Sequence, residues 1–237
     1  MQTLSQLTLA TIRSDEAKVA LQAIELWSTL AEKEMELNDM AAKLAETGQS
    51  PQPESVCFGY VSAASDELVP ILAELLTRQD EEAEIDDDQW NPSMSGATCL
   101  QLVANTVEDA IVPRIMPFVR QHIQSNNWRY KEAAVMAISS ILSGPSDDAI
   151  GPCVNQSISF LLTALSDPNV LVKDTAAWAI SRICHLQVRL IPVDIFPTLV
   201  NGLAGKLLTE TPRVSSKVCI GIYYLAAAQN DSAAATS

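Results

Sequence analysis

The feature that most constrains this fold is a helical segment that recurs at equal intervals of about forty residues. The segment has one pattern of small and apolar residues, and it occurs at 130–141, 172–183 and 214–225. The small residue before its central Ile is Ala137, Ala179 or Gly221. Self-similarity at such a period is typical of repeat proteins, so we interpret the chain as a tandem array.

Each repeated segment follows a turn and a preceding helix-period run. The turns contain residues that begin helices: Asn126-Asn127-Trp128, Asp167-Pro168-Asn169 and Glu210-Thr211-Pro212. A unit is therefore a pair of helices of about forty residues, within the HEAT/armadillo range. One pair cannot bury its own apolar stripe, whereas stacked pairs share a continuous core.

We therefore predict an all-α fold, a HEAT-repeat α-solenoid, which is a superhelix of antiparallel helix pairs. The prediction places one solenoid over residues 1–230, with an acidic loop at 80–89 and a frayed tail at 231–237. Its five helix pairs span approximately 2–45, 64–108, 109–143, 150–187 and 193–229. Within them, we expect helices from Glu16 to Ala31, Ser65 to Thr77 and Val154 to Leu165, among others.

The charge balance restricts the partners. The chain has 29 acidic and 15 basic residues, for a net charge of -14. Nucleic acid and anionic membranes both require a basic face, so we expect neither, and the imbalance favours a basic partner. The longest apolar stretches are too short for membrane insertion.

Cysteine and histidine usage indicates a compartment and argues against catalysis. The five cysteines are scattered, without the spacing of a zinc site or disulfide framework. We expect Cys99, Cys184 and Cys219 to be buried reduced thiols, which with no visible signal peptide favours cytoplasm or nucleus. His122 and His185 are far apart and no catalytic motif occurs, so we expect no enzyme, cofactor or metal.

An acidic run followed by a tryptophan is the first candidate binding site. The run contains six carboxylates and no base: Glu81, Glu82, Glu84, Asp86, Asp87 and Asp88. Carboxylates attract Lys and Arg, and the indole of Trp90 can stack on a guanidinium. The alternative is an ordinary hydrated acidic loop, since such dense like charge repels itself.

The second candidate is one face of the helix near residue 178. On a helical wheel, one face is the expected buried seam, formed by Ala176, Ala179, Ile180 and Ile183. The opposite face carries Asp174, Trp178, Ser181 and His185. Equivalent repeat positions predict a row of Met136, Trp178 and Ile220, which in a HEAT solenoid lines the concave surface. The alternative is that Trp178 only packs against a neighbouring helix.

Several stretches together resemble the importin-β family. They are Ile24-Glu-Leu-Trp-Ser28, Leu68-Val-Pro-Ile-Leu72, Asp86-Asp-Asp-Gln-Trp-Asn-Pro92, Glu108-Asp-Ala-Ile-Val-Pro113, Asn127-Trp-Arg-Tyr-Lys-Glu-Ala-Ala-Val-Met-Ala137 and Val172-Lys-Asp-Thr-Ala-Ala-Trp178. The resemblance runs from about Glu16 to Leu225 and looks like a middle section, roughly the seventh to eleventh repeats of that family.

The resemblance implies a nuclear transport receptor. The expected partners are the basic importin-β-binding segment of importin-α, basic import cargo, Ran GTPase and, in part, Phe-Gly nucleoporins. The acidic loop, Trp90 and Trp178 match the family's binding residues, whereas Ile220 stands where the family often has a further Trp. The expected location is cytoplasm, nucleus and nuclear pore, and Ran-GTP regulates release in full-length members.

A different class of function stays open at this point. A HEAT-repeat scaffold subunit of another assembly, such as a phosphatase subunit, would bind partners through its inter-repeat loops. Removal of residues 81–88 distinguishes the two, because a pure scaffold has little need of the acidic run.

Overall fold

The structure is a computed structural model that describes residues 2–13, 16–48, 55–79 and 91–235. Every regular element within these ranges is helical, so the all-α prediction is confirmed. The α-helices are α1 (Gln2–Ile12), α2 (Ala17–Glu46), α3 (Tyr60–Leu75), α4 (Pro92–Val107), α5 (Ile111–His122), α6 (Trp128–Ser140), α7 (Asp147–Ala164), α8 (Val170–Leu186), α9 (Phe196–Ala204) and α10 (Pro212–Ala235). Two 3-10 turns, η3 (Glu108–Ala110) and η4 (Val188–Leu190), precede α5 and α9.

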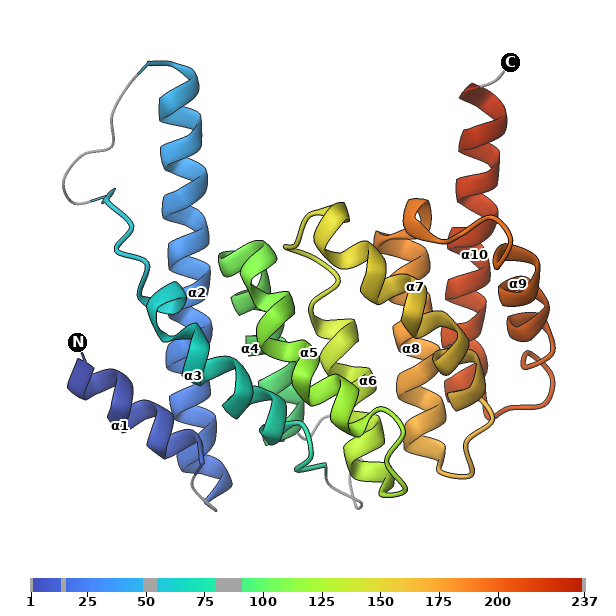
Figure 1. Ribbon diagram of the computed structural model, residues 1–237, viewed down its shortest axis with the longest axis horizontal. Helices are drawn as coiled ribbons and strands as arrows, with labels where there is room; N and C mark the ends of the chain where they lie inside the picture. Colours follow the sequence, from blue (N-terminus) through green and yellow to red (C-terminus); the bar gives the residue numbers. More distant parts are fainter. Residues whose placement is uncertain (1, 14–15, 49–54, 80–90, 236–237) are drawn as a thin grey trace. The chain divides into compact units, whose positions relative to one another are not determined.

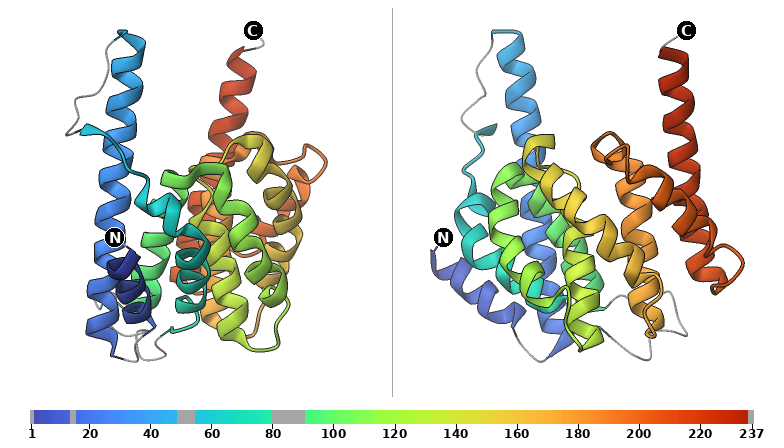
Figure 2. Two further views of the ribbon diagram at one scale, coloured as in Figure 1. Left: turned by 60° about the vertical axis from the view of Figure 1, so that its left-hand side comes forward. Right: turned by 45° about the vertical axis from the view of Figure 1, so that its right-hand side comes forward.

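The chain divides into two compact units. Their helices are drawn in Figures 1 and 2. Unit 1 comprises Met1–Phe118 with Ser143–Pro145, and unit 2 comprises Val119–Leu142 with Ser146–Ser237. Unit 1 holds α1 to α4, and unit 2 holds α6 to α10. The division into five helix pairs along one solenoid stays a prediction.

In unit 2, the three repeated segments become α6, α8 and α10. Helix α8 packs against both α6 and α10, with α7 on α8 and α9 on α10 (Figure 1). The predicted seam is confirmed, because each of its members on α8 is at most 2% exposed: Ala176, Ala179, Ile180 and Ile183. Burying such apolar surface contributes about 25 cal/mol per Å² removed from water.

Asparagine side chains begin the second helices, as the turn sequences indicated. The side-chain oxygen of Asn127 accepts a hydrogen bond from the Arg129 N–H at 3.0 Å. In the next repeat, Asn169 accepts from the Leu171 N–H at 2.9 Å. Each bond satisfies a backbone donor that the first helical turn leaves unpaired, which fixes where the helix starts.

In unit 1, a carboxylate performs the same task from another helix. Glu34 of α2 is 4% exposed, and its carboxylate accepts from the N–H groups of Tyr60 and Val61 at the start of α3. Gly59, with φ 66°, provides the left-handed turn before that start. The negative carboxylate also lies at the positive end of the helix dipole.

Helix α2 is longer than the sequence pattern indicated. The expected helix ended at Ala31, yet α2 continues to Glu46, largely exposed along its second half (Figure 1). Residues 32–46 contain many strong helix formers and no Gly or Pro, and the first breaker is Gly48 with φ 71°. The helix propensity of these residues therefore extends α2, although this part of it has no apolar stripe.

Three other boundaries correct the prediction. The expected frayed tail from 231 is helical as far as Ala235, because the chain there is rich in alanine, the best helix former. Helix α7 begins at Asp147 instead of Val154, where two aspartates of the first turn favour the helix N-terminus. Helix α3 begins at Tyr60 instead of Ser65, at the start capped by Glu34.

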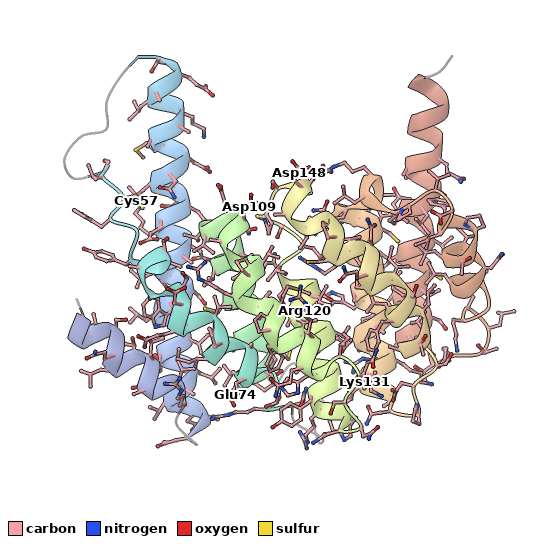
Figure 3. All side chains as sticks on the ribbon, viewed as in Figure 1. Cys57, Glu74, Asp109, Arg120, Lys131 and Asp148 are labelled. Carbon is pink, nitrogen blue, oxygen red and sulfur yellow. The ribbon has the colours of Figure 1, made fainter. Side chains whose placement is uncertain are left out.

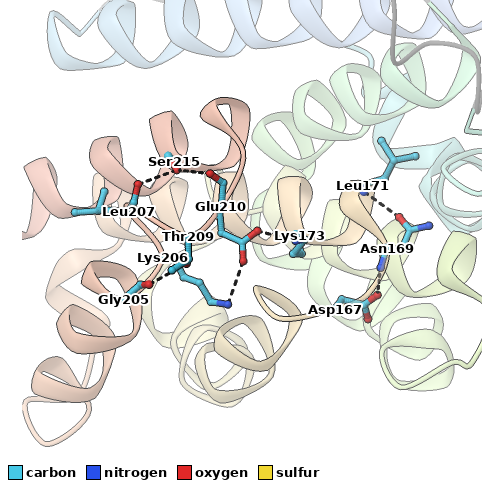
Figure 4. A network of polar contacts seen from close by, with 10 residues as sticks. All are labelled: Asp167, Asn169, Leu171, Lys173, Gly205, Lys206, Leu207, Thr209, Glu210 and Ser215. Atoms are coloured by element: carbon cyan, nitrogen blue, oxygen red, sulfur yellow. Dashed lines mark hydrogen bonds and ion pairs between the residues drawn. The ribbon is translucent and has the colours of Figure 1, made fainter.

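Ion pairs repeat between successive helix pairs of unit 2. Lys131 on α6 binds Asp167 at 2.7 Å. In the next repeat, Lys173 on α8 binds Glu210 at 2.6 Å, as Figure 4 shows. The two lysines occupy equivalent positions of successive repeats. The repeat therefore forms a similar lysine–carboxylate pair in each of them. The hydrogen bond from Lys173 lowers the pKa of Glu210, and Lys206 adds to this effect at 3.2 Å.

Two of the three predicted buried thiols are buried. Burial raises the pKa of Cys99 and of Cys184 to about 12, which makes both unreactive at neutral pH. Cys219 is exposed, so its predicted burial is wrong. Its neighbour Ile220 is likewise exposed, at 48%.

We predict that Gly144→Ala strongly destabilises the protein. Gly144 has φ 103°, and a Cβ built there would lie 2.3 Å from the Ala104 carbonyl oxygen. We expect the free energy of unfolding to fall by at least roughly 2 kcal/mol, because backbone must move. Gly59→Ala is the control, since φ is also positive but the space is open, and should cost about 1 kcal/mol. Chemical denaturation measures both, and equal losses would contradict the steric explanation.

We predict that Glu210 makes stability depend on acid pH. Its pKa is lowered from 4.5 in the folded chain, so its contribution is present above that value and is lost as pH falls through the folded pKa. Glu210→Gln should therefore be less stable than the wild type at about pH 7, and the difference should shrink below about pH 4.5. Denaturant unfolding across this range measures it. The control is Glu74→Gln, an exposed carboxylate of α3 (Figure 3), which should leave the free energy of unfolding at about pH 7 within about 0.5 kcal/mol of the wild type.

Candidate partner-binding surface

The acidic run and its tryptophan lie outside the described residues. This applies to Glu81, Glu82, Glu84, Asp86, Asp87, Asp88 and Trp90. Their assignment as binding residues stays a prediction. The described part of the predicted surface is therefore α8, with Asp174 and Trp178, and its neighbours in unit 2.

Asp174 is engaged within the fold. Its side chain is buried, and its carboxylate accepts hydrogen bonds from Arg213 Nε at 2.8 Å and from Lys217 Nζ, both on α10. The helical wheel grouped Asp174 with the polar face, but α10 covers that part of α8. Ser181 is likewise 6% exposed. Asp174 thus fastens α10 to α8, and two bases already balance its charge.

Trp178 is half-buried, and a guanidinium of its own chain already stacks on its ring. The Arg182 Cζ lies 5.1 Å from the ring centroid, one helical turn further along α8. Arg182 Nε donates to the Ser139 carbonyl at 3.1 Å, which holds the guanidinium in place. Burial lowers the pKa of Arg182, and its Nη2 has no hydrogen-bond partner among the described residues. This indole is therefore accessible only in part.

The predicted row along the second helices is partly exposed. Met136 of α6 and Trp178 of α8 are half-buried, and Ile220 of α10 is 48% exposed. All three stand at the same repeat position on helices that pack side by side. None is sealed in the core, so a partner could contact each of them.

The structure contains an aromatic cluster that the sequence did not predict. We define it as His185, Tyr223 and Tyr224. The ring of Tyr224 stacks on His185 with centroids 4.2 Å apart and planes at 18°, and Tyr223 meets Tyr224 edge-on at 5.3 Å. Tyr223 is 67% exposed. The only signal in the sequence was the Tyr-Tyr pair itself, in a repeat position that the other segments fill with smaller or basic residues.

Charge is divided very unevenly between the two units. Unit 1 has 21 acidic and 6 basic residues, whereas unit 2 has 8 acidic and 9 basic residues. Unit 1, which includes the acidic run, thus has a net charge of -15, and unit 2 has a net charge of +1. Unit 2 is nearly neutral, so its net charge does not attract a charged partner.

Unit 1 contains an apolar groove between α1, α2 and α3. Its volume is about 400 Å³, and Leu9, Trp27 and Tyr60 are among the residues that line it. Trp27 is itself buried, and its indole N–H has no acceptor among the described residues. The groove offers an aromatic and aliphatic lining to an apolar side chain.

Known proteins share this sequence and arrangement. The HEAT-like repeat family matches residues 128–183. Importin subunit beta-1 of Arabidopsis thaliana is 38% identical over 239 residues, which cover 98% of this chain and 27% of that protein. Kap95p, the importin-β of yeast, bound to RanGDP has a TM-score of 0.85 at 37% identity, over 94% of this chain and 25% of that chain. The chain belongs to the importin-β family.

A second Kap95p structure agrees with this assignment. The Kap95:Nup1 complex has a TM-score of 0.83 at 36% identity, over 93% of this chain and 24% of that chain. The predicted fold class, a HEAT-repeat α-solenoid, is confirmed by these likenesses. This importin-β segment spans about a quarter of the length of the relatives that it matches.

The described residues of the importin-β segment contain neither a metal-binding group nor a membrane span. No group of three or more His, Cys, Asp or Glu side chains in this part of the chain could hold a metal ion. Over the same residues, no helix is long and apolar enough to cross a membrane.

We predict that Asp174→Ala destabilises this importin-β segment. The substitution leaves Arg213 and Lys217 without their shared carboxylate, and hydrogen bonds to charged groups are worth roughly 1.5–3 kcal/mol when buried. Because both bases are partly exposed, we expect a loss of roughly 1–2 kcal/mol in the free energy of unfolding. Asp39→Ala, at an exposed position in the middle of α2, is the control and should not lower it by more than about 0.5 kcal/mol. A loss no larger than the control's in chemical denaturation would contradict a structural role for Asp174.

Proposed function

We propose that this chain is the part of a nuclear transport receptor that binds the basic importin-β-binding segment of importin-α, or a basic import signal on cargo. The observation that carries the proposal is the family relationship over nearly the whole chain, at 38% identity over 98% of its length. The chain works in the cytoplasm and nucleus and passes the nuclear pore. In the full receptor, Ran-GTP regulates release of the load.

The charge of unit 1 supports a basic partner. A net excess of 15 carboxylates on one unit attracts cations over distances of about a Debye length, roughly 8 Å at physiological salt. Six of these acids belong to the run from Glu81 to Asp88, which contains no base. Such a field accelerates encounter with an arginine-rich segment and repels acidic proteins.

Aromatic rings supply the second element of the proposed recognition. Trp90 and Trp178 stack on guanidinium groups of the bound segment, each for roughly 0.5–2 kcal/mol. Arg182 already lies 5.1 Å from the Trp178 ring centroid, so a guanidinium of the bound segment stacks on the part of this half-buried ring that stays accessible. Asp174 contributes indirectly, by holding α10 beside the helix that carries Trp178.

Ran and nucleoporins are further proposed partners. Kap95p has been solved with RanGDP and with Nup1, and this chain is similar to about a quarter of Kap95p. We propose that the chain keeps a part of each contact. For a Phe-Gly nucleoporin, the groove of unit 1 with Leu9, Trp27 and Tyr60 offers room for a phenylalanine side chain.

We predict that an arginine-rich import peptide binds this chain and that salt weakens the binding steeply. Replacement of the six acids of the run by their amides should raise the Kd at least roughly tenfold, since six weak ion pairs of about 0.2–1 kcal/mol are lost. Trp178→Ala should raise it roughly 2- to 30-fold, by loss of one stacking contact. Fluorescence anisotropy at two or more salt concentrations measures each Kd.

The matched control removes charge elsewhere in unit 1. Amides at Glu32, Glu36, Asp39 and Glu46, which are exposed on α2, lower the net charge without touching the run. If this variant loses as much affinity as the variant of the run, the attraction is non-specific. If neither the run nor Trp178 affects binding, the importin-type function is wrong and a scaffold role is favoured.

A further inference from the structure

The ring of Trp178 holds a cation of its own chain before any partner binds. Arg182 Cζ lies 5.1 Å from the ring centroid, within the roughly 6 Å over which a ring face attracts a cation. Both residues belong to α8 and stand one helical turn apart, so the helix keeps them together. Trp178 is half-buried although α6 and α10 both pack on α8, so part of its surface stays accessible beside the neighbouring second helices.

Arg182 is anchored to the preceding second helix. Its Nε donates a hydrogen bond to the Ser139 carbonyl oxygen at 3.1 Å. Ser139 lies in the last turn of α6, where the backbone carbonyl groups have no partner within the helix. A cation at this end also interacts favourably with the helix dipole. The guanidinium therefore caps α6 from the next repeat, and it stays beside the indole when a partner approaches.

Capping alone does not explain a charged side chain at this position. One neutral N–H donor is enough for the Ser139 carbonyl, whereas the Nη2 atom of Arg182 is buried and has no hydrogen-bond partner among the described residues. Burial also lowers the pKa of Arg182, because desolvation disfavours its charged form. A buried donor without an acceptor costs free energy. The fold thus retains a guanidinium at the ring of Trp178 despite this cost.

The guanidinium and the indole occur together in one of the three repeated segments. The other two segments combine an aliphatic or thioether side chain with a residue that is not basic, at the same two positions: Met136 with Ser140, and Ile220 with Tyr224. Helices α6 and α10 both pack on α8 without an arginine at this position. The arginine is therefore no general requirement of the repeat, and it accompanies the indole.

We propose that Arg182 limits the affinity of the Trp178 position for the basic segment, because it holds a fixed guanidinium at the ring that an incoming arginine must share. The inference rests on the proposed function and concerns how strongly that same site binds. Two cations at one ring repel each other and are attracted by the same ring quadrupole. Most changes at an interface act on the dissociation rate, so Arg182 favours release of the bound segment.

The test is the affinity of the full chain for an arginine-rich import peptide, measured by fluorescence anisotropy. Arg182→Gln keeps an amide donor for the Ser139 carbonyl and removes the charge, so the Kd should fall roughly two- to tenfold. Chemical denaturation of the same variant should show equal or lower stability, because the cap of α6 is weakened. A purely structural role would lower stability and affinity together. If the glutamine variant does not fold, Arg182→Met keeps the aliphatic stem and should show the same gain in affinity.

Arg129→Gln is the matched control. Arg129 Cζ lies 4.7 Å from the ring centroid of Trp128, so this variant also removes one charge and one guanidinium from a tryptophan of unit 2. It should change the Kd by less than about twofold. Combination with Trp178→Ala completes a double-mutant cycle. Without the indole, Arg182→Gln should give no gain in affinity beyond that of the control.

The outcomes separate the two proposals. If the wild type binds the peptide and Arg182→Gln binds it no more tightly than Arg129→Gln does, Arg182 does not limit the affinity, while the proposed function stands. If the gain persists undiminished in the Trp178→Ala background, it comes from net charge alone and the inference is wrong. If the wild type does not bind the peptide, the proposed function fails and this inference fails with it.

Discussion

The rest of the structure depends on burial of the second-helix seam against the neighbouring repeat. Ala176 and Ala179 are fully buried, and small side chains here let helix backbones approach closely. At Gly221 a Cβ would already lie 3.6 Å from Ser181 Cα, so α10 and α8 lie in close contact. Because the pattern recurs at equal intervals along the chain, each repeat brings the same surface to its neighbour.

Close stacking of the second helices also buries polar residues, which then need hydrogen-bond or ion-pair partners. Once α10 lies against α8, Asp174 loses its water, and its charge is tolerable only with partners. Arg213 and Lys217 supply them, as Lys173 does for Glu210. The carboxylates of unit 2 therefore hold repeats together, and few remain to attract a partner.

The sequence predicted what depends on one helix and missed what depends on its neighbours. The seam on α8 and the caps at Asn127 and Asn169 follow from periodicity and local turn chemistry. Burial of Asp174 and exposure of Cys219 do not, since each is decided by whether another helix covers that face. The ends of α2 and α10 were missed for the opposite reason, because propensity alone carries these helices beyond their apolar pattern. The binding role of the acidic run rests on its charge pattern and on the family resemblance, because these residues lie outside the described part of the chain.

If the proposed function is correct, one part of the chain attracts the basic segment and another part selects arginine over lysine. Unit 1 has nearly all the net charge, and a diffuse negative field attracts lysine and arginine alike. The ring of Trp178 in unit 2 acts only at contact and favours the planar guanidinium. Salt should therefore weaken the first contribution far more than the second. The ratio of arginine to lysine affinity should accordingly rise with ionic strength, which a binding mode based on charge alone does not produce.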